Sequence, residues 1–350
     1  MAPPADPPTS DSGTTSHRDD EAAAIAVRRA GPDDLPAVLR LAQASLGWRA
    51  DDPNDAFFRW KHQDNPAGVS PMWVAVAGDR LVGFRTFLRW RFRTGAGATA
   101  TAVRAVDTAT HPDFQGRGIF SRLTLGALDE LREEGVAFVF NTPNDQSRPG
   151  YLKMGWQVVG RVPICMRPRG PLAAWRSARS RVAAEKWSID SPAGIPAGEA
   201  LADDHDLDRL LAATEAATGR ASSPTAIETD RTPAHLRWRY RFEPLHYRAI
   251  VASGGPASGL AIFRVRRRGA AIEAVLCELL APDGGVSLVQ EIARATRADY
   301  VIAAGRAPAG ARLVPVPRQG PILTWRAVAD GATAPPLDDW RLTMGDVELF

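Results

Sequence analysis

Cysteine is scarce in this chain, and the cysteines that it has lie far apart. Only Cys165 and Cys277 occur among 350 residues, and neither has a His or Cys neighbour at metal-ligand spacing. The sequence therefore indicates neither a disulfide framework nor a zinc site, and we expect no bound metal. We expect both cysteines to be buried, reduced thiols.

Long apolar runs and a strong excess of one charge are also missing. No stretch approaches the roughly 20 apolar residues that span a bilayer, and residues 1–22 lack the apolar core of a signal peptide. The net charge of +3, from 43 basic and 40 acidic residues, is too small for a nucleic-acid footprint. We therefore expect a cytoplasmic protein without a membrane span, for which nucleic acid is an improbable partner.

Length and composition predict two globular domains. Residues 1–22 are rich in Pro, Ser, Thr and Asp, which predicts a disordered tail. We expect a first domain over 23–165, a basic linker helix over 166–187 and a second domain over 188–350. The basic segment is also compatible with a membrane surface, but its apolar face is too thin for stable interfacial binding.

The first domain alternates strand and helix patterns. The sequence predicts a strand at Ile25, a helix over 35–46, and two strands within 72–95 that are joined at Gly78-Asp79. Four further segments follow the strand at 101–110: a helix from 119 to 135, a buried strand at 136–142, a short helix at 146–154 and a strand at 155–164. This order predicts an α/β layer with mixed strand pairing.

The second half echoes the first. "FFRWKHQDNP" (57–66) is similar to "HLRWRYRFEP" (235–244), and a strand hairpin is predicted after each. "TAVRAVDTATHPD" (101–113) corresponds in kind to "AAIEAVLCELLAPDGG" (270–285), with a helix after each. The pattern predicts tandem, similarly folded domains, of which the second lacks the QGRG segment described next.

"HPDFQGRGIFSRL" (111–123) places two glycines where a strand gives way to a helix. Free backbone amides and the dipole at a helix N-terminus favour anionic oxygens, and glycine lets a phosphate approach closely. The loop is neither a dinucleotide fingerprint nor a phosphate-binding loop ending in Gly-Lys-Ser/Thr. Alternatively, the glycines only relieve strain in the turn.

Together with "NDQSRPGYLKMGW" (144–156), this loop resembles the Gcn5-related N-acetyltransferase (GNAT) family. The family loop Gln/Arg-x-x-Gly-x-Gly/Ala maps onto Gln115, Gly118 and Phe120, where phenylalanine replaces the usual small residue. The resemblance implies an acyl-CoA N-acyltransferase fold, a mixed and mostly antiparallel sheet flanked by helices, here in tandem copies. It also implies acetyl-CoA as the co-substrate, held by Thr108, Ala109, Thr110, Gln115, Gly116, Arg117, Gly118, Ile119, Phe120 and Asn144.

Acyl transfer to an amine requires loss of a proton, because alkyl amines have a pKa near 10.4. Asp107 stands at the end of the strand just before the loop and is the nearest carboxylate that could act as the base, directly or through water. Alternatively, Asp107 pairs with Arg104 or binds local backbone. Tyr151 matches the family tyrosine that protonates or hydrogen-bonds the leaving thiolate, or else it only packs. Asn144 either contacts the pantetheine arm or caps the short helix.

The sequence thus predicts direct acetyl transfer from acetyl-CoA to a primary amine of a small molecule or peptide. The alternatives are a non-catalytic acyl-CoA-binding regulator and a tandem-domain aminoacyltransferase. Two segments of the second half add hypotheses. "RVRRRG" (264–269) is typical of an exposed basic hairpin, and "GDVELF" (345–350) places a terminal carboxylate that some multi-domain relatives are thought to use as the base.

Overall fold

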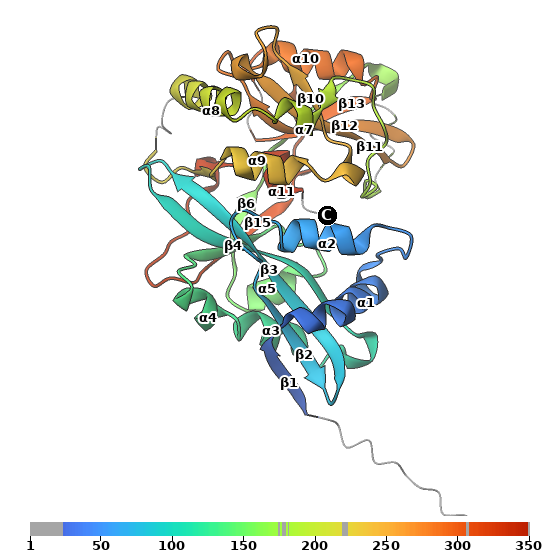
Figure 1. Ribbon diagram of the computed structural model, residues 1–350, viewed down its shortest axis with the longest axis vertical. Coiled ribbons are helices and arrows are strands. Elements are labelled where there is room, and N and C mark those ends of the chain that lie inside the picture. Colours follow the sequence, from blue (N-terminus) through green and yellow to red (C-terminus); the bar gives the residue numbers. More distant parts are fainter. Residues whose placement is uncertain are drawn as a thin grey trace, which may run out of the picture.

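The computed structural model describes residues 24–173, 176, 180, 182–218, 223–305 and 308–348. Two sheets form separate lobes, and helices α2 and α9 lie between them (Figure 1). The predicted tail over 1–22 lies outside the described residues.

The first sheet is mostly antiparallel. Its strand order is β1 (Ile25–Arg29), β2 (Met72–Ala77), β3 (Arg80–Thr94), β4 (Thr99–Thr110), β5 (Phe138–Asn141), β15 (Ile322–Ala327) and β6 (Gln157–Arg161). Only β4 and β5 are parallel along this path. The short strand β9 (Ile227–Thr229) pairs with the end of β3 and with β16 (Trp340–Arg341).

The second sheet repeats this arrangement. Its order is β8 (Ile195–Pro196), β10 (Arg248–Val251), β11 (Leu260–Arg268), β12 (Ala271–Leu280), β13 (Tyr300–Ala304), β7 (Ile164–Pro168) and β14 (Val314–Pro315). Its fourth and fifth strands, β12 and β13, are again the parallel pair. A bulge interrupts the pairing of the third and fourth strands in both sheets.

Each sheet takes its sixth strand from the other half of the chain. β15 inserts between β5 and β6, whereas β7 lies between β13 and β14. The expected division at residues 165 and 188 therefore does not separate the two sheets. The expected linker helix over 166–187 begins instead within β7, and residues 174, 175, 177–179 and 181 lie outside the described part.

Helices cover both faces of the first sheet. α1 (Leu35–Leu46) and α2 (Asn54–His62) pack on one face, and α3 (Ile119–Leu125), α4 (Leu128–Glu133) and α5 (Arg148–Lys153) pack on the other. The second half contributes α7 (Ala197–Ala200), α8 (Asp204–Thr218), α9 (Pro233–Tyr240), α10 (Val286–Ala295) and α11 (Met344–Val347). The mixed α/β class with helix-flanked, mostly antiparallel sheets is confirmed.

Local predictions in the first half are confirmed at most elements. The helix at 35–46 and the strand hairpin at Gly78-Asp79 form as expected. The single helix predicted from 119 to 135 is wrong in one respect, because it breaks into α3 and α4 near Gly126. A Cβ atom there would lie 2.8 Å from the carbonyl oxygen of Arg122, which explains the glycine at the break.

One apolar core joins the two sheets. It contains buried side chains of the first sheet, such as Trp90 and Phe140, together with Ile262 and Val275 of the second. Burial of apolar area on this scale is the main favourable term in folding. The two sheets therefore pack as one continuous body around this core.

Candidate functional site

The site begins at the bulge in β4. Strand pairing aligns Arg85 with Thr108 and Thr86 with Val106, so Asp107 is the extra residue. Asp107 has a φ of 42°, a left-handed conformation that is uncommon outside glycine. The bulge shifts the alternation of side chains along β4. As a result, the Asp107 side chain points toward α2.

Asp107 binds two consecutive side chains of α2. Its Oδ2 atom lies 2.7 Å from Lys61 Nζ and 2.8 Å from His62 Nε2, and all three side chains are buried. The other ring nitrogen of His62, Nδ1, lies 3.0 Å from the Ser70 hydroxyl oxygen. Asp107 therefore pairs with α2, rather than with Arg104 as the alternative proposed.

The charges of this cluster are set by burial and by pairing. Burial by itself raises the pKa of Asp107, but the Lys61 ammonium and the His62 hydrogen bond hold that pKa well below its usual value. Burial lowers the pKa of His62, although Asp107 opposes this shift. Asp107 is thus ionised and His62 neutral at neutral pH, which makes Asp107 a weak proton acceptor.

Arg104 holds the end of the described chain beside this cluster. Its guanidinium donates to Thr142 Oγ1 at 2.9 Å, to the Val347 carbonyl at 2.7 Å and to the Asp346 carbonyl. Burial lowers the pKa of Arg104 to about 10. Glu348 is the last described residue, so the terminal carboxylate proposed as an alternative base lies outside the described part.

The glycine loop is exposed and open. Gly116 and Gly118 have φ values of 77° and 71°, and no atom lies within 4 Å of a Cβ built on either. Their conformation, rather than crowding, therefore favours glycine. Gly118 caps α3, and the first amides of a helix have no acceptor within it. Gln115 and Arg117 are also exposed, and the Arg117 guanidinium lies over the Phe114 ring.

Beside the loop, β4 and β5 diverge. They pair only through residues 102–104 and 138–140. From Ala105 to Thr110, β4 continues without a described strand partner on that side. The Thr108 hydroxyl donates to the Phe84 carbonyl at 3.0 Å, and Ala109 is buried toward α1. An unpaired strand edge therefore runs from the bulge to the glycine loop.

Tyr151 and Phe120 pack together across this opening. Tyr151 on α5 is buried, and its ring meets that of Phe120 edge to face at 5.3 Å. A Cβ atom at Gly150 would lie 3.1 Å from the Phe120 ring. Phe120, the departure from the family motif, thus turns toward α5, with Ile119 buried beside it. The Phe120 ring leaves the glycine loop uncovered.

Asn144 takes the capping arrangement that was one of its two expected roles. Its Oδ1 atom accepts from the Ser147 backbone amide at 2.8 Å and from the Ser147 hydroxyl at 2.9 Å. These bonds precede α5 and fix its start. The side-chain amide nitrogen of Asn144 is a separate donor, so the expected contact with an acyl-CoA arm stays a prediction.

Two buried cations of the site went unnoticed in the sequence. Lys61 and Arg85 are both almost fully buried, at 1% and 0% exposure. Arg85 donates through Nη2 to the Tyr151 hydroxyl. The only sequence signal is a charged residue within an otherwise apolar element, "GFRTF" for Arg85, which many exposed strand faces share.

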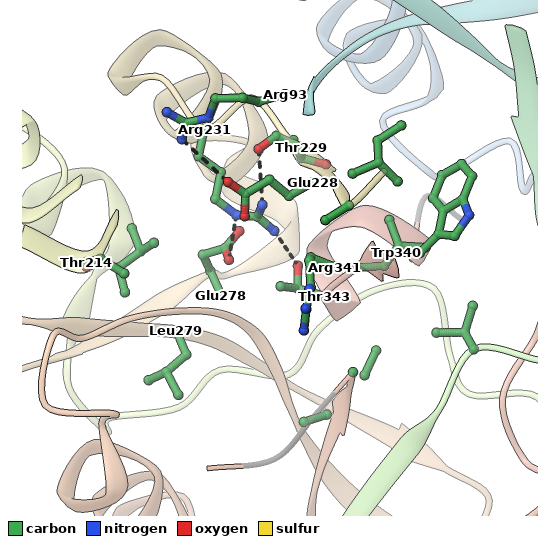
Figure 2. A pocket seen from close by; sticks show the side chains of 18 of the residues that line it. Arg93, Thr214, Glu228, Thr229, Arg231, Glu278, Leu279, Trp340, Arg341 and Thr343 are labelled. Carbon is green, nitrogen blue, oxygen red and sulfur yellow. Dashed lines mark hydrogen bonds and ion pairs between the residues drawn. The ribbon is translucent and has the colours of Figure 1, made fainter. Parts of the chain in front are cut away.

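A second cavity lies elsewhere, with a volume of about 610 Å³, and residues such as Arg93, Glu228 and Arg231 line it (Figure 2). Arg93 and Thr94 at one end of β3 line this cavity, and Arg85 of the same strand does not. The floor of the cavity is Arg231, which lies 2.9 Å from both Glu278 and Asp346. Burial lowers the pKa of Arg231, but these two carboxylates outweigh it and raise that pKa. The charged side chains of Arg231, Glu278 and Asp346 are therefore already paired with one another.

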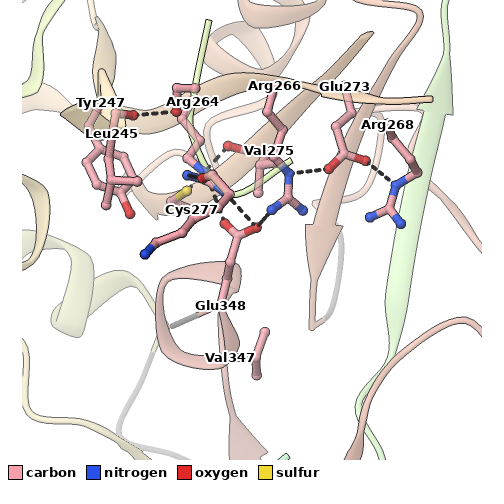
Figure 3. Close-up of polar contacts among 12 residues, drawn as sticks. Leu245, Tyr247, Arg264, Arg266, Arg268, Glu273, Val275, Cys277, Val347 and Glu348 are labelled. Carbon is pink, nitrogen blue, oxygen red and sulfur yellow. Dashed lines mark hydrogen bonds and ion pairs between the residues drawn. The ribbon is translucent and has the colours of Figure 1, made fainter. Parts of the chain in front are cut away.

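The arginines of "RVRRRG" do not form the exposed basic hairpin that was expected. Arg264 and Arg266 are buried and bind Glu348, and Arg266 and Arg268 bind Glu273 (Figure 3). That prediction is wrong for these three arginines, because they lie on one face of β11 where acidic partners offset their burial, whereas Arg267 is exposed. The cluster fixes Glu348, and with it the end of the described chain.

The described part of the chain has neither a metal-binding cluster nor a membrane-spanning helix. No group of three or more His, Cys, Asp or Glu side chains is placed to hold a metal ion. No helix there is both long enough and apolar enough to cross a bilayer. Cys165 and Cys277 are buried, as predicted, and the Cys165 thiol donates to the Gly305 carbonyl oxygen. Burial raises the pKa of Cys277 to about 12.

Several solved structures share this fold, among them two GCN5-related N-acetyltransferases. The one from Kribbella flavida matches 87% of this chain and 71% of its own, with a TM-score of 0.59 at 18% identity. The one from Anabaena variabilis matches 87% and 73%, with a TM-score of 0.60 at 12% identity. Eis1 from Mycobacterium abscessus matches 87% and 74%, with a TM-score of 0.51 at 14% identity. The fold is therefore that of the N-acyltransferase class.

Sequence comparison identifies the family. Residues 26–159 match the acetyltransferase (GNAT) domain, which confirms the family resemblance for this part of the chain. A mycothiol acetyltransferase of Rhodococcus jostii (strain RHA1) is 26% identical over 141 residues, which cover 36% of this chain. The chain spans 43% of the length of that relative.

Proposed function

We propose that the protein is an acetyl-CoA-dependent N-acetyltransferase that acts on a primary amine of a small molecule or peptide. One observation carries the proposal. The glycine-capped start of α3 stands at the end of an unpaired β4 edge, and the buried hydroxyl-bearing Tyr151 lies across the same opening. In this arrangement the start of α3 would bind an anion, the β4 edge would bind an extended chain such as pantetheine, and Tyr151 would donate a proton or hydrogen bond.

The described residues fit acetyl-CoA. The space around Gly116 and Gly118 is open, so a pyrophosphate can approach the amides from Gly116 to Ile119. The pantetheine arm would follow Thr108 to Thr110, where β4 has unpaired backbone groups. Phe120 does not obstruct this path, because its ring packs on Tyr151.

The thioester supplies the activated acetyl group, and the residues of the chain control protons and charge. Attack by the neutral amine forms the C–N bond and breaks the C–S bond, so negative charge develops on sulfur. Tyr151 would donate a hydrogen bond to that sulfur. Complete proton transfer from a phenol to a thiolate is uphill by roughly 2 kcal/mol from their reference values, so hydrogen bonding supplies most of the stabilisation.

We propose an electrostatic role for Asp107. Its ion pair with Lys61 and its bond to His62 make it a weak base, and His62 has both ring nitrogens engaged. Asp107 would instead fix the position of α2 and of the bulge. The amine proton would then leave through water or through a group outside this cluster.

We also propose that the second half is a degenerate copy of the same fold. The matching strand order and the matching bulge support this proposal. At the corresponding helix start, Gly285 has a φ of 66°, but a Cβ there would lie 2.6 Å from Leu279 Cδ1. In the second copy, side chains thus fill the space at the start of this helix, where the first copy is open. This difference supports a structural role for the second copy.

Turnover tests the activity. The purified protein is incubated with acetyl-CoA and a panel of primary amines, and the release of free CoA thiol is followed. We expect amine-dependent release that falls about 10- to 100-fold in Tyr151→Phe, the range for a lost transition-state donor. Binding of acetyl-CoA without turnover with any amine would favour the non-catalytic regulator instead.

A further inference from the structure

Arg85 is a buried cation with an unusual set of neighbours. It is 0% exposed, and it lies on β3 directly opposite Thr108, the residue after the bulge. Three aromatic rings surround its guanidinium carbon, those of Phe87 at 5.1 Å, Tyr151 at 5.2 Å and Phe120 at 5.3 Å. Such contacts favour a cation but do not replace a counter-ion.

The hydrogen bonding of Arg85 is incomplete. Its Nη2 atom donates to the Tyr151 hydroxyl, whereas Nε and Nη1 have no hydrogen-bond partner within the described structure. Among the described residues, no carboxylate forms an ion pair with it, in contrast to Arg231 and Arg266. Burial of a charge without a counter-ion is unfavourable, so Arg85 lowers the free energy of unfolding of the protein.

Charged groups on the elements around Arg85 and Tyr151 are directed elsewhere. Asp107 on β4 faces α2, and Arg148 on α5 binds Asp145 at 2.7 Å. Arg326 on β15 lies over the Trp156 ring and donates to the Met154 carbonyl. The Arg85 guanidinium is therefore the charge in direct contact with the Tyr151 hydroxyl.

We propose that Arg85 is a positioning residue for acetyl transfer. It holds the Tyr151 oxygen as an acceptor, so that the phenolic hydrogen is directed into the opening between β4 and β5. It also places a positive charge behind the tyrosine, where the CoA thiolate leaves. This inference rests on the proposed function.

The energetic argument concerns the charge that appears during the reaction. When the C–S bond breaks, the electron pair stays on sulfur, and the phenol donates to that sulfur. A buried guanidinium bonded to the phenol oxygen stabilises negative charge on either the sulfur or the phenol oxygen. The absence of a carboxylate beside Arg85 then serves the reaction, because a counter-ion there would cancel the stabilisation of the developing negative charge.

Binding of free CoA at different pH values tests this role without an acceptor. A site that favours the thiolate binds CoA more tightly as pH rises from 7 to 9, across the reference thiol value of about 8.5. We expect this increase to be several-fold in the unaltered protein and absent for desulfo-CoA, which lacks the thiol. In Arg85→Gln the increase should disappear. Arg85→Lys, which keeps the charge and is the second variant if Arg85→Gln fails to fold, should retain part of it.

Arg89→Gln is the matched control. Arg89 lies on the same strand, and its partner is Glu134 rather than Tyr151. We expect this variant to keep the full pH dependence of CoA binding. An equal pH dependence in Arg85→Gln and the unaltered protein would overturn the proposal for Arg85. Absence of any CoA binding in the unaltered protein would instead overturn the proposed function.

Discussion

Trp60 and Trp238 form a reciprocal pair across the two halves of the chain. The indole nitrogen of Trp60 donates to the Trp238 carbonyl at 2.6 Å, and that of Trp238 donates to the Trp60 carbonyl at 2.7 Å. Their rings stack with centroids 5.9 Å apart. Both residues belong to the repeated Arg-Trp motif, on α2 and α9. The two copies of the repeated motif therefore contact each other directly across the two halves of the chain.

This pair makes the second half a support for the site. α2 carries Lys61 and His62, the partners of Asp107, so its position against α9 sets the geometry of the cluster. We expect Trp238→Ala to destabilise the protein by about 3–5 kcal/mol, the range for removal of a large buried aromatic side chain. Urea denaturation followed by tryptophan fluorescence and by circular dichroism measures the change. A loss below 1 kcal/mol would contradict the packing described.

Asp107→Asn is expected to destabilise the chain by a similar amount. The substitution removes the negative charge that offsets the buried Lys61 ammonium, and breaking such a buried pair costs about 3–5 kcal/mol. Denaturant titration at pH 7 provides the measurement. The double variant Asp107→Asn with Lys61→Met is the control, and it should recover part of the lost stability because neither charge remains.

The same pair predicts a response to acid. The pKa of Asp107 is depressed in the folded state, so its contribution to stability is complete above the unfolded value near 3.9. That contribution declines as pH falls below this value toward the lower folded pKa. The stability difference between the unaltered protein and Asp107→Asn should therefore shrink below pH 4. A difference that stays constant from pH 7 to pH 3 would refute this assignment.

His235 predicts a second pH effect at less acidic values. Burial lowers its pKa to about 3, so the unfolded chain binds a proton near pH 6.5 that the folded protein does not. Stability should therefore fall as pH is lowered from 6.5 toward 3, by up to about 1.4 kcal/mol per pH unit for this group. His235→Phe preserves contact with Trp90 and removes the titration. Thermal unfolding across this range should show a shallower slope for the variant.

Lys186 should titrate well below an ordinary lysine. Its ammonium lies 3.9 Å from the Phe57 ring centroid and close to Trp48 and Trp187, and burial lowers its pKa to about 8. Competitive labelling with acetic anhydride between pH 6 and 10, read by peptide mass spectrometry, measures the midpoint. We expect half-maximal reactivity near pH 8, whereas a midpoint near the reference value of about 10.4 would be inconsistent with this environment.

Local sequence signals predicted local structure well. The amphipathic pattern of α1 and the Gly78-Asp79 hairpin depend on residues that are close in the sequence, and both form as expected. The insertion of β15 between β5 and β6 depends on contacts more than 150 residues apart, for which no local pattern exists. The exchange of strands between the sheets was therefore beyond prediction from one sequence.

The site shows the same division. The sequence predicted the glycine loop and Tyr151 as site residues because their motifs are continuous in the sequence. The partners of Asp107 were missed because α2 lies 45 residues before the bulge, and the bulge itself sets the direction of the side chain. The arginines of β11 appeared exposed in the sequence, because Glu348, which binds two of them, comes from the far end of the chain.

Calorimetric titration with acetyl-CoA tests the central claim most directly. Gly118→Trp should abolish binding by filling the loop. Gly97→Trp is the matched control, since Gly97 has a similar φ of 84° and equally open surroundings at the opposite end of β4. We predict binding to the unaltered protein and to Gly97→Trp, and none to Gly118→Trp. Failure of the unaltered protein to bind acetyl-CoA, or undiminished binding to Gly118→Trp, would contradict the account.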